Sequence, residues 1–171
     1  MRSSSKPFLK PEKKVPASLA EAREKLTHFC SYQERSLRQV KQKMKSLGVE
    51  SGWIEPILEY LLSEGYLNES RFASTFVRGK SQGRGWGPKK IAFRLKMEGI
   101  ASEEIDQTLT ETDWEKAESK LKEALTKKKA ELDRKKDPNW KPKLIRFCLS
   151  RGFNLDKAQA ILKNQFSDWS R

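Results

Sequence analysis

The segment SQGRGWGPKK, residues 81–90, decides between two folds for this chain. A phosphate-binding loop would space its glycines as G-x-x-x-x-G-K-[ST] and would follow a β-strand. Here the glycines lie two residues apart, at Gly83, Gly85 and Gly87, and no strand-like run precedes them. Pro88 suits the first position of a helix, where its missing N–H costs nothing. The segment therefore predicts a turn between two helices rather than a nucleotide site.

The rest of the chain also favours helices. Its 171 residues contain no run of alternating β-branched residues and no Asn-Gly or Asp-Gly hairpin turn. Apolar residues instead recur three and four positions apart, as they do on one face of a helix. Charged residues make up 35% of the chain and hydrophobic residues 36%, which suits thin, repeated helical units better than one thick core. We therefore expect an all-α protein.

An internal repeat is anchored on Gly48, Gly99 and Gly152, which are 51 and 53 residues apart. Each glycine has apolar residues eight and four positions before it, and one, six and ten positions after it. Positions eight and four before the glycine share one helical face, and glycine readily ends a helix in the left-handed conformation. The apolar residue after the glycine can then fold back on the last turn. Each repeat predicts two helices joined by a glycine turn, with a further helix before them.

The repeat divides the chain into units that must stack on their neighbours, because units of this size cannot bury their apolar faces alone. We expect a disordered basic N-terminal arm at 1–17 and three-helix repeats at 18–66, 67–112 and 113–171. The expected helices are 18–31, 36–47, 52–64, 69–81, 88–98, 103–112, 113–135, 141–151 and 155–166. The expected N-caps are Ser51, Asn68, Ser102 and Asn154.

The charge of the chain points to an acidic partner. A formal net charge of +13 implies nucleic acid, a membrane surface or an acidic protein. The charge is also uneven, since residues 49–70 hold five acids and no base, whereas residues 71–98 hold eight bases and one acid. Salt bridges between neighbouring helices account for part of this pattern. They do not account for a net charge of +7 over 71–98, which favours an external anion.

Nothing in the sequence predicts a membrane or secretory location. No apolar run approaches the ~20 residues that a membrane span needs. The start, MRSSSKPFLKPEKKVP, lacks the apolar stretch of a secretory signal. We expect a cytoplasmic protein with no membrane partner. A transit peptide is the alternative for the Ser- and Lys-rich start.

The residues that often carry chemistry have simpler explanations here. Cys30 and Cys148 lie at apolar positions of helical patterns, which predicts buried free thiols in a reducing compartment, with a disulfide or metal pair as the alternative. His28 has no obvious nucleophile or acid partner and is expected on a helix surface. The pair Glu103 and Glu104 is typical of the first turn of a helix. We expect no catalytic residues, no metal and no cofactor, and so no enzyme.

The helix that begins at Pro88 has a basic outer face. Ile91, Ala92 and Leu95 form its buried stripe. The other side holds Lys89, Lys90, Phe93, Arg94, Lys96 and Met97. Its two apolar residues either pack against a neighbouring repeat or contact a partner, and both interpretations stay open. Trp86, in the turn before the helix, either anchors that turn against the core or stacks on a base.

At these residues the sequence resembles the RecX family, bacterial regulatory proteins of the RecA recombinase. The resemblance is strongest over 65–100, where it rests on GYLNESRFA (65–73), Gly87-Pro88, Ile91, Leu95, Gly99 and Ile100. The family's first-repeat motif is similar to Arg35-Ser36 with Val40, Lys43 and Met44. The likeness weakens over 138–166 and is absent in 1–17. Departures are Gln33, where the family often has Arg, and Gln39 and Arg94, where it often has Glu; Arg94 makes this surface more basic than usual.

The resemblance implies tandem three-helix repeats in an elongated, curved molecule, which we expect to be a monomer. It implies a non-enzymatic regulator that binds along the groove of the RecA–single-stranded DNA filament and inhibits its extension, ATPase, strand exchange and co-protease activities. Expected partners are the filament, single-stranded DNA and also duplex DNA; the alternative is a general DNA- or RNA-binding helical module without a recombinase partner. The residues expected to contact RecA or DNA are Arg71, Arg78, Lys80, Arg84, Lys89, Lys90, Phe93 and Arg94, with Lys141, Lys143 and Arg146 as a second patch.

Overall fold

The computed structural model describes residues 15–169, and within that range every regular element is a helix. The helices are α1 (Leu19–Tyr32), α2 (Leu37–Leu47), the 3-10 turn η1 (Ser51–Trp53), α3 (Ile54–Ser63), α4 (Glu69–Arg84), α5 (Pro88–Met97), α6 (Ser102–Thr110), α7 (Glu115–Arg134), α8 (Trp140–Ser150) and α9 (Leu155–Gln165). The all-α prediction is confirmed. Most of the predicted arm, residues 1–14, lies outside the described residues.

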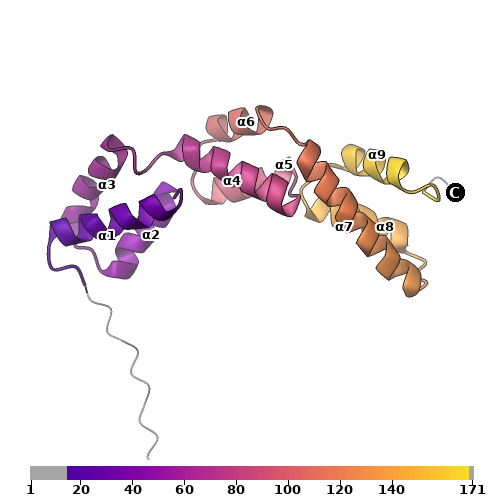
Figure 1. The fold of residues 1–171 in the computed structure, drawn as a ribbon, viewed down its shortest axis with the longest axis horizontal. Helices are drawn as coiled ribbons and strands as arrows, with labels where there is room; N and C mark the ends of the chain where they lie inside the picture. The colour runs from indigo at the N-terminus through magenta and orange to yellow at the C-terminus, as the bar shows by residue number, and fades with distance from the viewer. Residues whose placement is uncertain (1–14, 170–171) are drawn as a thin grey trace, which may run out of the picture.

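The helices group in threes along an elongated, curved molecule (Figure 1). Helices α1–α3 form one end, α4–α6 the middle and α7–α9 the other end. Each group surrounds its own buried apolar cluster. Two residues lie at the boundaries: Leu67 is buried in the first cluster, and Trp114 packs against both the second and the third. The predicted elongated and curved shape is confirmed.

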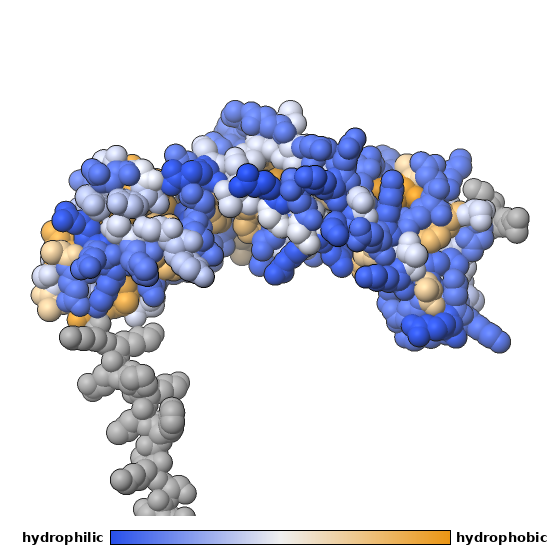
Figure 2. Space-filling view, in the orientation of Figure 1, coloured by the Kyte–Doolittle hydropathy of each residue, from blue (hydrophilic) through white to orange (hydrophobic). Residues whose placement is uncertain are grey.

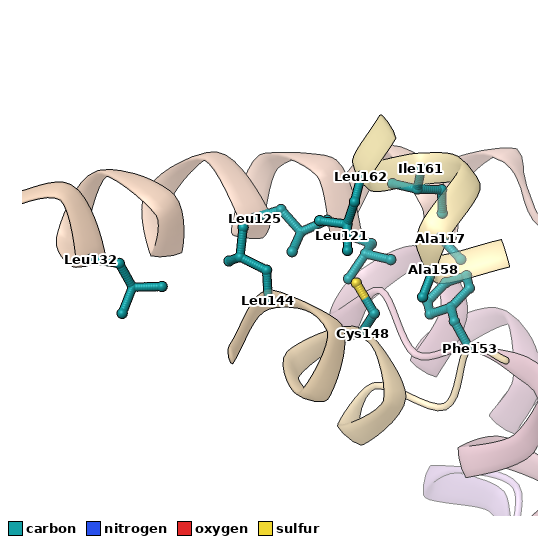
Figure 3. Packing of buried hydrophobic residues seen from close by; sticks show 10 residues of the cluster. All are labelled: Ala117, Leu121, Leu125, Leu132, Leu144, Cys148, Phe153, Ala158, Ile161 and Leu162. Atoms are coloured by element: carbon teal, nitrogen blue, oxygen red, sulfur yellow. The ribbon is translucent and has the colours of Figure 1, made fainter. Parts of the chain in front are cut away.

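The third cluster lies between α7, α8 and α9 (Figure 3). Leu121 and Leu125 of α7 pack with Leu144 and Cys148 of α8, and all four side chains are almost fully buried. Loss of hydration raises the pKa of the Cys148 thiol to about 11, and it raises the pKa of Cys30 in the first cluster to about 11 as well. Both cysteines are free and buried, as the sequence predicted.

The three repeat glycines end their helices in the same way. Gly48, Gly99 and Gly152 have φ of 69°, 89° and 94°, in the left-handed region that favours glycine. In each turn the residue after the glycine donates its N–H to the carbonyl of the residue four before the glycine. The pairs are Val49 to Met44 (3.1 Å), Ile100 to Leu95 (3.1 Å) and Phe153 to Cys148 (3.3 Å). The apolar residue four positions before each glycine and the one directly after it are therefore the two partners of a helix-ending hydrogen bond.

The N-caps were predicted with mixed success. Asn68 and Asn154 are caps, and their side-chain oxygens accept from backbone N–H groups at 2.8 Å. The predictions for Ser51 and Ser102 were wrong. Each serine is already the first residue of its helical turn, and the extended residue before it, Glu50 or Ala101, occupies the cap position without a side-chain hydrogen bond.

Helix α4 is also longer than predicted, since it continues to Arg84 instead of ending at residue 81. Gly83 therefore lies inside the helix, and Gly85 ends it in the left-handed conformation with φ of 61°. Pro88 begins α5, as predicted.

The turn at residues 85–87 packs directly against the turn between α8 and α9. The N–H of Gly87 donates to the Arg151 carbonyl at 2.7 Å, and the N–H of Lys89 donates to the Gly152 carbonyl at 3.0 Å. The free N–H groups at the start of α5 and the free carbonyls at the end of α8 thus satisfy each other. The predicted turn between two helices is confirmed. The N–H groups of Gly87 and Lys89, which a phosphate would need as donors, already donate to carbonyl oxygens.

We call this contact between the middle and last groups of helices the second joint. It leaves no room for side chains at three glycines. A Cβ on Gly87 would lie 2.7 Å from the Gly152 carbonyl oxygen, and a Cβ on Gly152 would lie 2.4 Å from the Lys90 backbone nitrogen. A Cβ on Gly85 would lie 2.8 Å from Cβ of Lys120 on α7. The middle and last groups therefore meet backbone to backbone.

The first joint, between the first and middle groups, is made by polar side chains. The Ser36 hydroxyl at the start of α2 donates to Oε2 of Glu98 at 2.7 Å, and Nε2 of Gln39 donates to the same oxygen at 3.2 Å. Arg38 donates to the carbonyl of Met97. Glu98, the one acid of the basic segment 71–98, thus holds the end of α5 against the start of α2.

Candidate functional site

Three cations gather where α4 and α5 meet. Lys80 and Arg84 lie one turn apart on α4, and Arg94 lies on α5. Partial burial lowers the pKa of the Lys80 ammonium, and the nearby positive charges of Arg84 and Arg94 lower it further. Like charges that repel one another this closely favour a bound anion, because an anion would relieve the repulsion.

The outer face of α5 is apolar as well as basic. Phe93 is 62% exposed and Met97 is 49% exposed, so neither packs into a neighbouring unit. This exposure disfavours the interpretation that the two side chains pack against a neighbouring repeat, and it favours contact with a partner. Lys89, Arg94 and Lys96 are exposed around them. An apolar pair ringed by cations suits a protein surface with apolar groups and carboxylates.

Trp86 anchors the turn between α4 and α5. Its ring is partly buried and packs against the second cluster. The ammonium of Lys90 lies 4.6 Å from the ring centroid and that of Lys80 lies 5.5 Å from it. These are cation–π contacts. The ring is therefore engaged within the chain, as expected for an anchor.

Three of the predicted site residues have partners inside the chain. Nε of Arg71 lies 2.5 Å from Oε1 of Glu34, which adds an ion pair to the first joint. The ammonium of Lys90 donates to the Ser150 carbonyl at 3.0 Å, across the second joint. Lys143 forms an ion pair with Asp137. These contacts give all three residues a structural role.

The remaining predicted cations are more available. Within residues 15–169, the side chains of Arg78, Arg84, Lys89, Arg94 and Arg146 make no ion pair or hydrogen bond with another residue. Arg146 lies on α8 with Lys141 and Lys143, in a different group of helices from the α4 and α5 cations (Figure 1). The structure therefore places the two predicted patches on separate units.

The outer face of α7 was not predicted from the sequence. Lys116, Lys127 and Arg134 are exposed there and make no ion pair among the described residues. Their spacings of eleven and seven residues, close to whole helical turns, were the available signal. The acidic residues mixed among these cations masked it, because a net charge over the segment counts all faces together.

Other kinds of site find little support in the described part of the chain. Residues 15–169 contain no group of three or more His, Cys, Asp or Glu side chains placed to hold a metal ion. No helix within that range is long and apolar enough to span a membrane. A hollow of about 600 Å³ beside α1 is lined by residues that include Phe29, Tyr32 and Arg35, but the Arg35 guanidinium already stacks 3.9 Å from the Phe29 ring centroid.

Comparison with known proteins decides the family. The family model for the second three-helix domain of RecX matches residues 68–109, which hold α4, α5 and nearly all of α6. The regulatory protein RecX of Halorhodospira halophila is 32% identical over 140 residues, a match that covers 81% of this chain and 84% of that protein. The chain belongs to the RecX family. The RecX protein of Pseudomonas putida, 33% identical over 127 residues, covers 74% of this chain and 80% of its own length.

RecX crystal structures share the fold. The crystal structure of RecX from Lactobacillus salivarius superposes with a TM-score of 0.72 at 22% identity and covers 86% of this chain and 96% of that one. A second RecX crystal structure gives the same TM-score and identity. The residues that match the family model include the helices that carry Lys80, Arg84, Lys89 and Arg94. The chain is therefore a regulatory protein of the RecX family.

Proposed function

We propose that this protein is a non-enzymatic regulator of recombination and repair that binds the RecA–single-stranded DNA filament. In this proposal it inhibits filament extension, ATP hydrolysis, strand exchange and co-protease activity. Family membership supports the regulatory role. The arched, repeated helices offer a long surface, which suits a filament better than a small substrate.

One observation carries the choice of a protein–DNA partner over DNA alone. Phe93 and Met97 are exposed between Lys89 and Arg94, which are exposed as well. Phosphates need the cations but have no use for the apolar pair, whereas a protein surface uses both. A filament supplies protein and DNA side by side, and so it fits the combined surface of α4 and α5.

The test is RecA ATPase activity on single-stranded DNA at increasing doses of the protein. The structure also indicates which residues to substitute. Lys90 is best left intact, because its contact with Ser150 supports the second joint. Lys89→Glu with Phe93→Ala and Arg94→Glu changes only exposed side chains. We expect the wild type to inhibit and the triple variant to inhibit at least about tenfold less, the equivalent of about 1.4 kcal/mol of binding.

A matched control is Lys41→Glu with Lys45→Glu on α2, two exposed lysines whose reversal changes the net charge equally. We expect this control to inhibit like the wild type. Absence of inhibition by the wild-type protein at any dose would refute the proposed function. Wild-type inhibition by the α5 variant would instead refute this surface as the contact site.

A salt titration separates the filament regulator from a general nucleic-acid-binding module. Affinity that depends on phosphate contacts alone falls by about 0.7 log units per log unit of salt for each contact on a single strand. A filament binder keeps more affinity in salt, because the Phe93 and Met97 contacts do not release counterions. We expect tighter binding to RecA-coated than to bare DNA at the higher salt concentrations.

A further inference from the structure

Helix α7 is the longest helix of the described chain, and its outer face carries a line of cations. Lys116, Lys127 and Arg134 are separated by eleven and seven residues, which is about three and about two helical turns. They therefore lie in one row along the helix axis, and the row is about 27 Å long. We call Lys116, Lys127 and Arg134 the α7 row.

The α7 row faces away from the third cluster. The buried residues of α7 are Ala117, Leu121, Leu125 and Leu132, which occupy the opposite side of the helix. In the view of Figure 2 the surface over α7 is largely hydrophilic. The row is thus held in place by packing on the far side, while its charged ends remain in solvent.

Ion pairs neutralise the neighbours of the α7 row but leave the row itself free. Lys120 pairs with Glu123 at 3.1 Å, and Lys128 and Lys135 both pair with Glu131 at 2.8 Å. Hydrogen bonds from Lys128 and Lys135 lower the pKa of Glu131 to about 2, so this carboxylate stays charged and engaged with them. The members of the row make no such pair within the described residues.

The chemistry of this face differs from that of α5. None of the large hydrophobic residues that are exposed in the described chain lies on α7, whereas α5 exposes Phe93 and Met97. Protein interfaces depend on desolvated apolar anchors. A row of free cations without any anchor suits a linear polyanion, whose phosphates need only charge and regular spacing.

The α7 row also continues the cation cluster of α4. Gly85 follows Arg84 at the end of α4, and its Cα lies so close to α7 that a Cβ would meet Cβ of Lys120 at 2.8 Å. Arg84 is therefore a near neighbour of Lys120, and Lys120 lies four residues after Lys116 on α7. The end of α4 that carries Arg84 therefore lies beside the N-terminal half of α7.

We propose that the outer face of α7 binds the phosphate backbone of nucleic acid, as a second site apart from the α5 face. This inference deepens the proposed function and rests on it for its biological setting, because it assigns DNA contact to α7 and protein contact to α5. The contact is independent of base sequence, since lysine and arginine side chains that bind phosphate oxygens meet the same group at every nucleotide.

The test measures binding of a labelled oligothymidylate of about 20 nucleotides by fluorescence anisotropy, without RecA, across a range of salt concentrations. The variant is Lys116→Gln with Lys127→Gln and Arg134→Gln, because glutamine keeps the helix propensity and removes only the charge. Loss of three phosphate contacts lowers the slope of log affinity against log salt by about 2 on a single strand. On a duplex of similar length the expected loss is about 2.7.

The control removes three exposed lysines elsewhere, Lys41→Gln with Lys45→Gln and Lys163→Gln, and we expect it to keep the wild-type slope. An equal loss in both triples would mean that net charge alone matters and would overturn the site. An unchanged slope in the α7 triple would overturn it too, and weaker binding of that triple to DNA-free RecA would then assign α7 to protein contact. Circular dichroism and the thermal midpoint verify the fold. RecA inhibition plays no part in the anisotropy result, so the proposed function and this inference can fail separately.

Discussion

At the scale of single residues, glycines within one helix-turn-helix segment have opposite effects. Gly87 has an ordinary φ of −85°, so alanine would fit its backbone, but a Cβ would meet the Gly152 carbonyl at 2.7 Å. Gly79 lies inside α4, and a Cβ there would meet nothing within 4 Å. The same residue type is therefore required at one position for contact and is merely tolerated at the other.

Alanine substitution at these two positions should change stability in opposite directions. Gly87→Ala is expected to lower the free energy of unfolding by about 1–3 kcal/mol, because backbone on both sides of the joint must move. Gly79→Ala is expected to raise it by up to about 1 kcal/mol through helix propensity. Urea denaturation followed by circular dichroism measures both. Equal effects of the two substitutions would show that the close approach at Gly87 has no energetic consequence.

The two buried thiols provide a second residue-scale prediction. With the pKa of Cys30 and Cys148 raised from 9.0 to about 11, the folded chain keeps both thiols protonated at pH values where the unfolded chain ionises them. The free energy of unfolding should therefore be unaffected below pH 9 and should fall between pH 9 and 11, by about 1 kcal/mol per pH unit for each thiol.

Thiol labelling at pH 8 offers a direct check of this burial. Both cysteines should react with a disulfide reagent far more slowly in the native protein than in denaturant, because the reagent needs an exposed thiolate. Cys148→Ala should show a shallower fall in stability above pH 9 than the wild type. Rapid labelling of two thiols under native conditions would contradict the burial of both clusters.

At the scale of elements, the ends of α2 and α5 depend on each other. The Ser36 hydroxyl accepts from the Gln39 N–H at 3.1 Å, which caps α2, and donates to Glu98 at 2.7 Å. Ser36 is fully buried, so both bonds lie out of solvent at that end. One side chain thus begins a helix and joins two units.

A double-mutant cycle on Ser36 and Glu98 measures this coupling. Ser36→Ala should cost about 1–2 kcal/mol, because the cap is lost together with the bond to Glu98. Glu98→Gln should cost less, because an amide oxygen still accepts from the hydroxyl. The coupling energy of Ser36→Ala and Glu98→Ala, from urea denaturation, should be at least about 0.5 kcal/mol. A coupling energy near zero would mean that the contact does not stabilise the joint.

Elements built from local contacts could be predicted from the sequence, and contacts between units could not. The glycine columns predicted every repeat turn, because each helix-ending bond joins residues only five apart. The caps at Ser51 and Ser102 were placed one residue late, since the sequence does not show where the extended residue lies. The partners of Arg71 and Lys90, 37 and 60 residues away, were out of reach for the same physical reason: they depend on how the units meet.

At the scale of the whole molecule, we propose three structural units at 18–66, 67–112 and 113–171, joined in two different ways. The first joint depends on side chains such as Glu98 and Arg71, whereas the second joins backbone to backbone. The Arg71–Glu34 pair of the first joint is exposed and can exchange with water, whereas each N–H of the second joint is fixed to a rigid helix end, so the first joint is expected to yield more easily.

Distance measurements between dye pairs can separate the two joints. Cysteines introduced at Ser46, Ser74 and Ser119, all exposed, place one label on each unit. Glu98→Ala should broaden the distance distribution between labels at 46 and 74 and leave that between 74 and 119 unchanged. Gly87→Ala should do the reverse. If both variants broadened both distributions alike, the two joints would not be independent.

The head-to-tail contact of α5 and α8 also has a consequence for how the chain is made. The carbonyls of Arg151 and Gly152 are synthesised more than 60 residues after the amide groups of Gly87 and Lys89 that bind them. At about 5–20 residues per second, the ribosome needs roughly 3–13 s to add that length. For those seconds the N–H groups of Gly87 and Lys89 lack these two carbonyl acceptors, so the start of α5 gains its final hydrogen bonds only after α8 has been made.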